Sequence, residues 1–149
     1  MKVQNLLSPV QKLKTFKGEK ISIALSGGVD TTLVLSLIRK IRPDINIEAV
    51  SIKFADSVDE TTTASKIAET FDANHNIVYL ENYLSELPKA ISMVKLPFWD
   101  LHWYYVVKKS KTLSKTIISG DGGDELFAGY TCLLYTSDAA DERSSVDLG

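Results

Sequence analysis

Residues 21–32 read ISIALSGGVDTT, and this stretch decides the fold. A short β-rich apolar run ends at Ser26, two glycines follow, and from Asp30 apolar residues recur at helical spacing as far as Ile41. The pattern predicts a strand, a glycine turn and the N-terminus of a helix. Glycines let the backbone approach an oxyanion, and the free N–H groups and positive dipole of a helix N-terminus favour it. The stretch therefore predicts an anion site.

The side chains of this stretch suit a polyphosphate that carries its own cation. Hydroxyl groups at Ser26, Thr31 and Thr32 can add hydrogen-bond donors, and the carboxylate of Asp30 can hold a divalent cation. The loop lacks a Gly-Lys-Ser/Thr ending, so it is not a phosphate loop of the Walker type. The alternative is an ordinary strand-to-helix turn with a Ser or Asp cap.

The run SGGVDTT resembles the pyrophosphate-binding loop of the PP-loop ATP pyrophosphatases. Members of that superfamily cleave ATP between its α- and β-phosphates and adenylate a carbonyl oxygen. They include the GMP, NAD, argininosuccinate and asparagine synthetases and tRNA-thiolating enzymes. The motif indicates the superfamily and leaves the member open.

Strand and helix patterns alternate along the rest of the chain. We expect strands over residues 45–54, 75–80 and 115–119, the last short and buried, and helices over 59–71, 83–93 and 98–113, with a break at Pro88. Right-handed crossovers then predict an α/β fold, a parallel twisted sheet with helices on both faces. Ligands bind such sheets at the carboxyl ends of the strands, where residues 26–32 and 120–124 follow the first and fourth strands.

The second of these loops carries two acids among glycines. Asp121 and Asp124 lie three residues apart in GDGGDELFAGY, a spacing that suits a hard cation bridging phosphate oxygens. A glycine turn with an N-capping Asp is the alternative. With Ser119, the stretch SGDGGDELFAGY closely resembles the signature of the synthetase domain of asparagine synthetases, S-G-[DE]-G-x-D-E-[LV]-F-x-G-Y. The resemblance covers about residues 21–130. It implies that these residues have the Rossmann-like fold of the PP-loop ATP pyrophosphatases.

The resemblance implies a role for each matching position and a reaction. Aspartate's side-chain carboxylate would attack the α-phosphorus of ATP, and ammonia would then displace AMP to give asparagine. Asp121 would be a catalytic residue near the acyl-adenylate. Asp30 and Asp124 would bind Mg²⁺. The pyrophosphate would be held by Ser26, Gly27, Gly28, Thr31 and Thr32, and adenine and ribose would be flanked by Leu25, Ile52, Ser119 and Gly120.

The sequence also departs from the family pattern. Lys2 stands where glutamine-hydrolysing members have a catalytic cysteine, which implies free ammonia or a separate glutaminase subunit as the nitrogen source. The family's later lysine and helices would lie beyond Tyr130, so we expect the chain itself to be inactive. Two alternatives stay open: a related ligase that adenylates another carboxylate, as in β-lactam or lasso-peptide cyclisation, and an ATP-binding domain without ligase chemistry. A tRNA-thiolating enzyme is disfavoured because neither a catalytic cysteine nor a basic surface is present.

The two ends of the chain differ from residues 21–131, which we expect to be a partial synthetase domain. Residues 1–20 read as a basic amphipathic leader helix or extension. The run CLLYTSDAADE, from Cys132, matches a translation of a transposase sequencing adapter. We therefore expect residues 132–149 to be non-native, with a genuine polar tail as the alternative.

Composition bounds the remaining possibilities. A formal net charge of −2 gives no electrostatic case for nucleic acid, and no apolar stretch is long enough to span a membrane. No signal peptide is evident, so we expect a cytoplasmic protein. The single cysteine excludes an internal disulfide framework and a multi-cysteine zinc site. We expect structural roles for His75, His102 and the aromatic side chains over residues 98–105.

Overall fold

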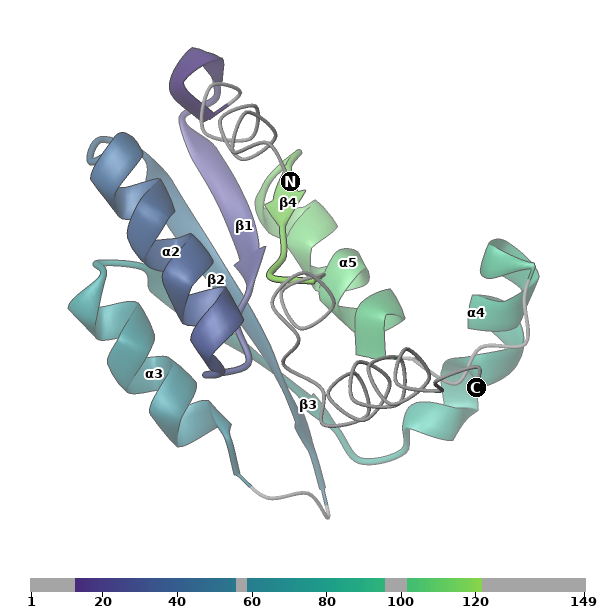
Figure 1. Ribbon diagram of the computed structural model, residues 1–149. Coiled ribbons are helices and arrows are strands. Elements are labelled where there is room, and N and C mark those ends of the chain that lie inside the picture. The colour runs from purple at the N-terminus through teal and green to yellow at the C-terminus, as the bar shows by residue number, and fades with distance from the viewer. Residues whose placement is uncertain (1–12, 56–58, 96–101, 122–149) are drawn as a thin grey trace, which may run out of the picture. The chain divides into compact units, whose positions relative to one another are not determined.

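The computed structural model describes residues 13–55, 59–95 and 102–121 (Figure 1). The chain divides into two compact units, residues 1–119 and 120–149, and every described helix and strand belongs to the first. In order, these elements are β1 (Lys20–Ala24), α2 (Val29–Ile41), β2 (Asn46–Phe54), α3 (Thr61–Thr70), β3 (Asn74–Leu80), the 3₁₀ helix η1 (Tyr83–Glu86), α4 (Leu87–Val94), α5 (His102–Leu113) and β4 (Ile117–Ile118).

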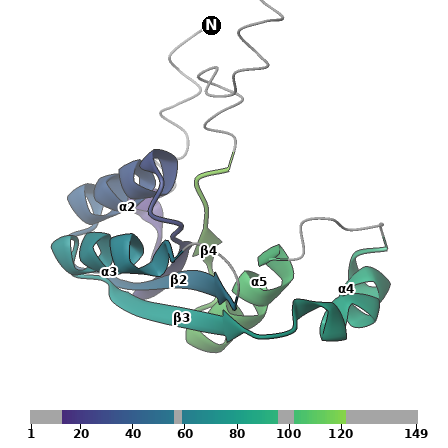
Figure 2. The same cartoon turned by 90° about the horizontal axis from the view of Figure 1, so that it is seen from below.

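The strands form one parallel sheet in the order β3-β2-β1-β4. Ile23 of β1 pairs with Ala49 of β2 on one side and Ile118 of β4 on the other. Helices α2 and α3 cover one face and α5 lies on the opposite face (Figure 2). This placement follows from right-handed crossovers, because the chain moves across the sheet in one direction from β1 to β3 and returns from β3 to β4. The predicted α/β fold is confirmed.

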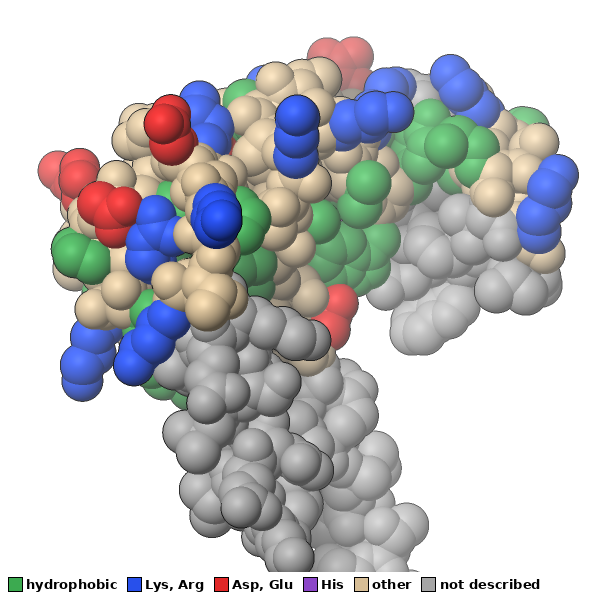
Figure 3. Space-filling model, turned by 90° about the horizontal axis from the view of Figure 1, so that it is seen from above, with side chains coloured by type: hydrophobic (Ala, Val, Ile, Leu, Met, Phe, Trp, Pro, Cys, Tyr) green, Lys and Arg blue, Asp and Glu red, His purple; other side chains and the backbone are tan. Residues whose placement is uncertain are grey.

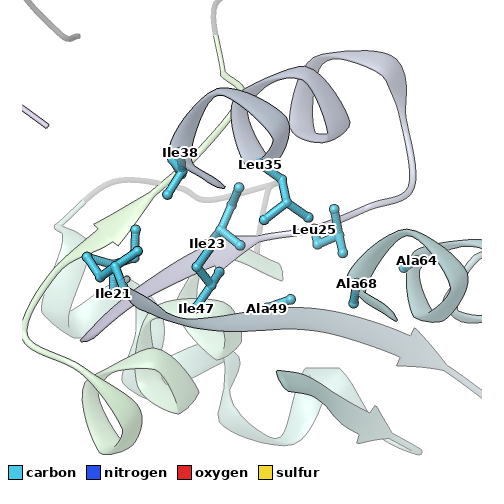
Figure 4. Packing of buried hydrophobic residues seen from close by; sticks show 10 residues of the cluster. Ile21, Ile23, Leu25, Leu35, Ile38, Ile47, Ala49, Ala64 and Ala68 are labelled. Carbon is cyan, nitrogen blue, oxygen red and sulfur yellow. The ribbon is translucent and has the colours of Figure 1, made fainter. Parts of the chain in front are cut away.

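Alternate residues of β1 and β2 build the core beneath α2 and α3. Ile21, Ile23 and Leu25 are at most 2% exposed and point toward the two helices (Figure 4). Burying one such aliphatic side chain contributes about 1.5–3 kcal/mol, so the cluster fixes both the strand before the glycine loop and the helix after it. Its other buried members are Leu35, Ile38, Ile45, Ile47, Ala49, Ala64 and Ala68.

A smaller cluster lies where α4 and α5 meet the sheet. Ala90 and Tyr105 are buried, and Ile52 and Leu80 pack against them. The ring of Tyr104 meets that of Tyr105 edge-on, with centroids 5.3 Å apart. The expected structural role of the aromatic run is thus confirmed for Tyr105, while residues 98–101 lie outside the described part of the chain.

The amino ends of the strands are tied together by two arginines near the end of α2. Arg39 donates four hydrogen bonds, to the carbonyl oxygens of Phe71, Pro43, Ile45 and Asp72. Arg42 forms a bidentate pair with Asp44, at 2.9 and 2.8 Å, and its hydrogen bond holds the pKa of Asp44 at about 2. Figure 3 views this end, where basic and acidic side chains are interspersed.

Three details differ from the sequence-based expectations or refine them. β4 is shorter than residues 115–119 and half-buried rather than buried, because among the described strands only β1 pairs with it. The helix expected from residue 59 begins at Thr61, since Asp59 Oδ1 accepts a hydrogen bond from Thr61 N at 3.0 Å and stays outside the helix. The break expected at Pro88 is confirmed: α4 begins at Leu87, and the first turn needs no proline N–H.

The leader predicted over residues 1–20 is described only from residue 13. Residues 13–15 are helical, and Leu13 and Phe16 pack against the core beneath α2. No helix in the described ranges combines the length and apolar character that a membrane crossing requires.

Candidate functional site

The glycine loop leaves the carboxyl end of β1 and runs directly into α2. Leu25 N still donates to Val50 O at 2.9 Å, so the sheet holds the chain up to this residue. Gly27 then turns the backbone with a φ of +85°, a conformation that residues with a Cβ rarely adopt. A Cβ at Gly27 would lie 3.4 Å from Ala64 N and 3.5 Å from Thr63 Cβ. These are ordinary van der Waals distances, so the turn, and not crowding by α3, is what requires glycine here.

Three hydroxyl groups gather around the backbone of Gly28. Thr32 Oγ1 and Thr31 Oγ1 donate to Gly28 O at 2.7 and 3.2 Å, and Gly28 N donates to Ser26 Oγ at 3.3 Å. Ser26 Oγ also lies 3.4 Å from Thr31 Oγ1. The structure therefore brings together the five residues that the sequence assigned to the pyrophosphate: Ser26, Gly27, Gly28, Thr31 and Thr32.

The first turn of α2 is open to an acceptor. Its N-cap is Gly28, with extended backbone angles of −72° and 167°, and no side chain caps this end of the helix. The Ser or Asp cap that the alternative, an ordinary strand-to-helix turn, assumed is thus absent here. The first N–H groups of an α-helix have no partner within the helix, so at this end they can bind an anion.

Asp30 supplies the one carboxylate in the first turn of α2. Its side chain is neither buried nor fully exposed. Within residues 13–55, 59–95 and 102–121, no three His, Cys, Asp or Glu side chains group closely enough to hold a metal ion. Mg²⁺ is usually bound by one or two carboxylates together with phosphate oxygens and water, so Asp30 beside the open helix end fits Mg²⁺ that arrives with a polyphosphate.

The residues expected beside adenine and ribose are more dispersed. The Leu25 side chain is 2% exposed and lies in the core, so only its backbone faces the loop. Ile52 is half-buried and packs against the Ala90–Tyr105 cluster. Ser119 follows β4, whose carboxyl end lies at the same edge as that of β1.

The expected acidic loop falls mostly beyond the described residues. Gly120 and Asp121 begin the second unit, in which Asp121 is an exposed turn residue. Asp124 lies outside the described residues. The roles assigned to these three residues stay predictions.

A polar chain beneath the loop was missed from the sequence. Ser51 Oγ donates to Leu25 O at 2.5 Å and lies 2.8 Å from His75 Nε2, while His75 Nδ1 lies 2.7 Å from Ser65 Oγ. Burial lowers the pKa of His75, which favours the neutral ring. No local pattern could connect these residues, because they meet only through the pairing of β2 with β3 and the packing of α3.

Solved structures share this fold. The structure of NMN synthetase from Francisella tularensis matches with a TM-score of 0.59 at 20% identity, over 85% of this chain and 56% of that one. NH₃-dependent NAD synthetase from Campylobacter jejuni matches with a TM-score of 0.55 at 18% identity, over 87% of this chain and 61% of that one. At such identities the likeness shows the fold, and it agrees with the predicted PP-loop, Rossmann-like class.

Similar sequences point to one family. A putative glutamine-hydrolyzing asparagine synthetase of Methanocaldococcus jannaschii is 30% identical over 132 residues, which are 85% of this chain and 26% of that protein. Glutamine-hydrolyzing asparagine synthetase 1 of Bacillus subtilis is 29% identical over 111 residues, 71% of this chain and 17% of that protein. The chain spans about a quarter of the first relative's length and less of the second's.

A family model described as asparagine synthase matches residues 2–147, nearly the whole chain. The match includes the glycine loop, the open end of α2 and the acidic loop that follows β4. Taken with the parallel sheet and the two relatives, it shows that the chain belongs to the asparagine synthase family.

Proposed function

We propose that this chain supplies the nucleotide-binding part of a cytoplasmic, ATP-dependent amide-forming ligase of the asparagine synthetase type. Its substrates are ATP, the side-chain carboxylate of aspartate, and ammonia. The products are asparagine, AMP and pyrophosphate. The observation that carries the proposal is the glycine loop at the carboxyl end of β1, which delivers three hydroxyl groups and an uncapped helix N-terminus to one place.

The loop residues act on the leaving pyrophosphate. In the first step an aspartate carboxylate oxygen bonds to the α-phosphorus of ATP, and the bond from that phosphorus to the oxygen bridging to the β-phosphorus breaks. Negative charge grows on the departing pyrophosphate, where the N–H groups of the first α2 turn and the hydroxyl of Ser26 stabilise it. The hydroxyls of Thr31 and Thr32 join them once they turn from Gly28 O, to which they donate in the structure. Asp30 and Asp124 are the residues that would hold Mg²⁺, and the ion would neutralise part of the same charge.

The second step forms the amide. The ammonia nitrogen attacks the acyl carbon of β-aspartyl-AMP, the carbon–oxygen bond to AMP breaks, and the nitrogen loses a proton. We assign Asp121 to the neighbourhood of this intermediate. We assign the contacts to adenine and ribose to Ile52, Ser119, Gly120 and the backbone of Leu25. A separate glutaminase subunit is one source of the ammonia; the two relatives above are named as glutamine-hydrolyzing enzymes.

The proposal is tested by aspartate-dependent exchange of labelled pyrophosphate into ATP, in a synthetase that carries these residues and the downstream part of the domain. Asp30→Asn should lower the exchange by about a hundredfold, because one charge-stabilising group at the leaving phosphate is lost. Asp44→Asn is the matched control: it makes the same change at the opposite end of the sheet and should leave the exchange unaltered.

Two results would contradict the proposal in different ways. Exchange that depends on another carboxylate and not on aspartate would indicate a related ligase of the β-lactam or lasso-peptide type. ATP binding without any exchange would indicate an ATP-binding domain that lacks ligase chemistry.

We also propose that residues 132–149 are not native to this synthetase domain. The support is the run CLLYTSDAADE, which corresponds to translated adapter sequence. The segment lies outside the described residues, and the family match extends through it to residue 147. Resequencing the source DNA across the codons for Tyr130 and Thr131 decides the matter: a frame that continues into family sequence supports the proposal, and an unchanged tail refutes it.

A further inference from the structure

The hydrogen bonds beneath the glycine loop define which atoms carry protons. Ser51 has one hydroxyl proton, and it is used on the carbonyl oxygen of Leu25, which can only accept. Toward His75 the Ser51 oxygen must therefore accept, so the ring carries its proton on Nε2. In a neutral ring Nδ1 then has a lone pair and accepts from the hydroxyl of Ser65. The result is a directed chain from α3 to the end of β1.

This chain reaches the backbone where the loop begins. The Leu25 carbonyl belongs to the peptide that joins Leu25 to Ser26, and the next residue but one, Gly27, rests against the first turn of α3. Ser65 lies in the same helix, one residue beyond Ala64. The loop is therefore held through hydrogen bonds from β2 and β3 at the point where it leaves the sheet, and it faces α3, the helix that carries Ser65.

If Ser51 and His75 only filled the core, they would not need to be hydrogen-bonded to each other and to Leu25 O. Ser51 is 5% exposed and lies on the face of β2 that is covered by α3, where apolar side chains form the rest of the cluster. His75 pairs in register with Ala49, so its ring must reach along β2 to meet Ser51. Buried hydroxyl and imidazole groups are tolerated when each is hydrogen-bonded, and a fully satisfied chain fixes one geometry.

We propose that His75 is a positioning residue for the glycine loop: held as the Nε2–H tautomer by Ser65, it keeps the Ser51 hydroxyl on the Leu25 carbonyl and so sets the peptide from which residues 26–28 start. The inference rests on the proposed function only for the identity of the ligand, pyrophosphate. Its structural part concerns the tautomer and the loop backbone.

The test uses the full 149-residue chain, labelled with ¹⁵N, and magnesium pyrophosphate as the probe. Ring nitrogen spectra of the wild type should show a protonated Nε2 and an unprotonated Nδ1 for His75. Ser51→Ala should shift the backbone amide signals of residues 26–28 and weaken pyrophosphate binding by about fivefold, the effect of one lost hydrogen bond. His75→Gln, which keeps a donor near the Nε2 position, should bind more tightly than His75→Leu.

Ser22→Ala is the matched control. Ser22 is fully buried in the neighbouring strand, and its hydroxyl also meets a serine hydroxyl, Ser114 Oγ at 2.7 Å. This bond involves the residue just after α5 and lies away from the loop. Ser22→Ala should therefore cost similar stability yet leave the amide signals of residues 26–28 and pyrophosphate binding unchanged.

The outcomes separate this inference from the proposed function. The inference would be overturned if Ser51→Ala and Ser22→Ala shifted the amide signals of residues 26–28 equally. It would also be overturned if the proton of the His75 ring were on Nδ1 and not on Nε2. If the wild-type chain binds no pyrophosphate, the proposed function fails for this chain. The inference is then decided by the amide signals of residues 26–28 and by the tautomer of His75. Should Ser51→Ala not fold, Ser65→Ala replaces it: the tautomer should then become mixed, and an unchanged Nε2–H ring would refute the role of Ser65.

Discussion

The two ends of the parallel sheet are built in opposite ways. At the amino end, Arg39 and Arg42 use long charged side chains to satisfy carbonyl groups and a carboxylate from several segments. At the carboxyl end, short hydrogen bonds from threonine hydroxyls to Gly28 O hold the glycine loop. No side chain caps the N-terminus of α2 there. The difference teaches how the two ends divide their tasks. At the amino end, arginine side chains satisfy backbone carbonyl groups and so stabilise the fold. At the carboxyl end, the first N–H groups of α2 stay available to a ligand.

Removing the guanidinium at the amino end should have the largest effect. Arg39→Met keeps an apolar stem but takes away four hydrogen bonds to backbone carbonyls, so we expect the free energy of unfolding to fall by about 2–3 kcal/mol. Urea unfolding measures this. Lys40→Met, at the exposed neighbouring position, is the control and should change stability little. Equal losses in the two variants would show that Arg39 does not tie this end together.

At the opposite end, Gly27→Ala should weaken both the fold and the binding of pyrophosphate. An alanine at a φ of +85° costs about 1–2 kcal/mol, and relief of that strain moves the loop, so we expect magnesium pyrophosphate to bind about tenfold more weakly. Calorimetric titration provides the measurement. Gly28→Ala, at a φ of −72°, should lose less stability. A larger loss at Gly28 would contradict the role given to the left-handed turn.

A smaller effect is expected from the hydroxyl groups of the loop. Thr32→Val has nearly the same shape but loses the 2.7 Å hydrogen bond from Oγ1 to Gly28 O, and we expect stability to fall by about 0.5–1 kcal/mol. Thermal unfolding detects such a change. Thr32→Ser retains the hydroxyl and should lose less than Thr32→Val. The reverse order would indicate that the methyl group, and not the hydrogen bond, matters.

The smallest effect is the pH dependence that Asp44 contributes at the amino end. Its pKa is lowered from 3.8 to about 2 in the folded chain, chiefly by the hydrogen bond from Arg42. The ionised carboxylate therefore stabilises the fold above pH 3.8, and this contribution is lost as the pH falls from 3.8 to about 2. The stability difference between wild type and Asp44→Asn should vanish across that window. A difference that persists below it would exclude the Arg42 pair as its source.

Local patterns predicted most of the fold and the loop. The order of strands and helices follows from apolar periodicity, and the turn at residues 26–28 follows from two glycines before a helical pattern. The burial of Leu25 could also have been read from the alternation of Ile21, Ile23 and Leu25 along one strand face. Its assignment to a nucleotide rested on family resemblance alone.

Long-range pairing explains what was not predicted. The link from Ser65 through His75 to Ser51 depends on the register between β2 and β3 and on how α3 packs above them. The four carbonyl partners of Arg39 likewise come from two turns, residues 43–45 and 71–72, that meet only in the folded chain. Neither arrangement leaves a short motif in the sequence.

The central claim is that the carboxyl end of β1 binds pyrophosphate while the amino end of the sheet only stabilises the fold. Titrating magnesium pyrophosphate into the ¹⁵N-labelled chain and following backbone amide signals tests it directly. We expect saturable shifts at residues 26–32 and none at residues 39–45. Shifts centred on residues 39–45, or a titration that leaves residues 26–32 unmoved, would contradict it.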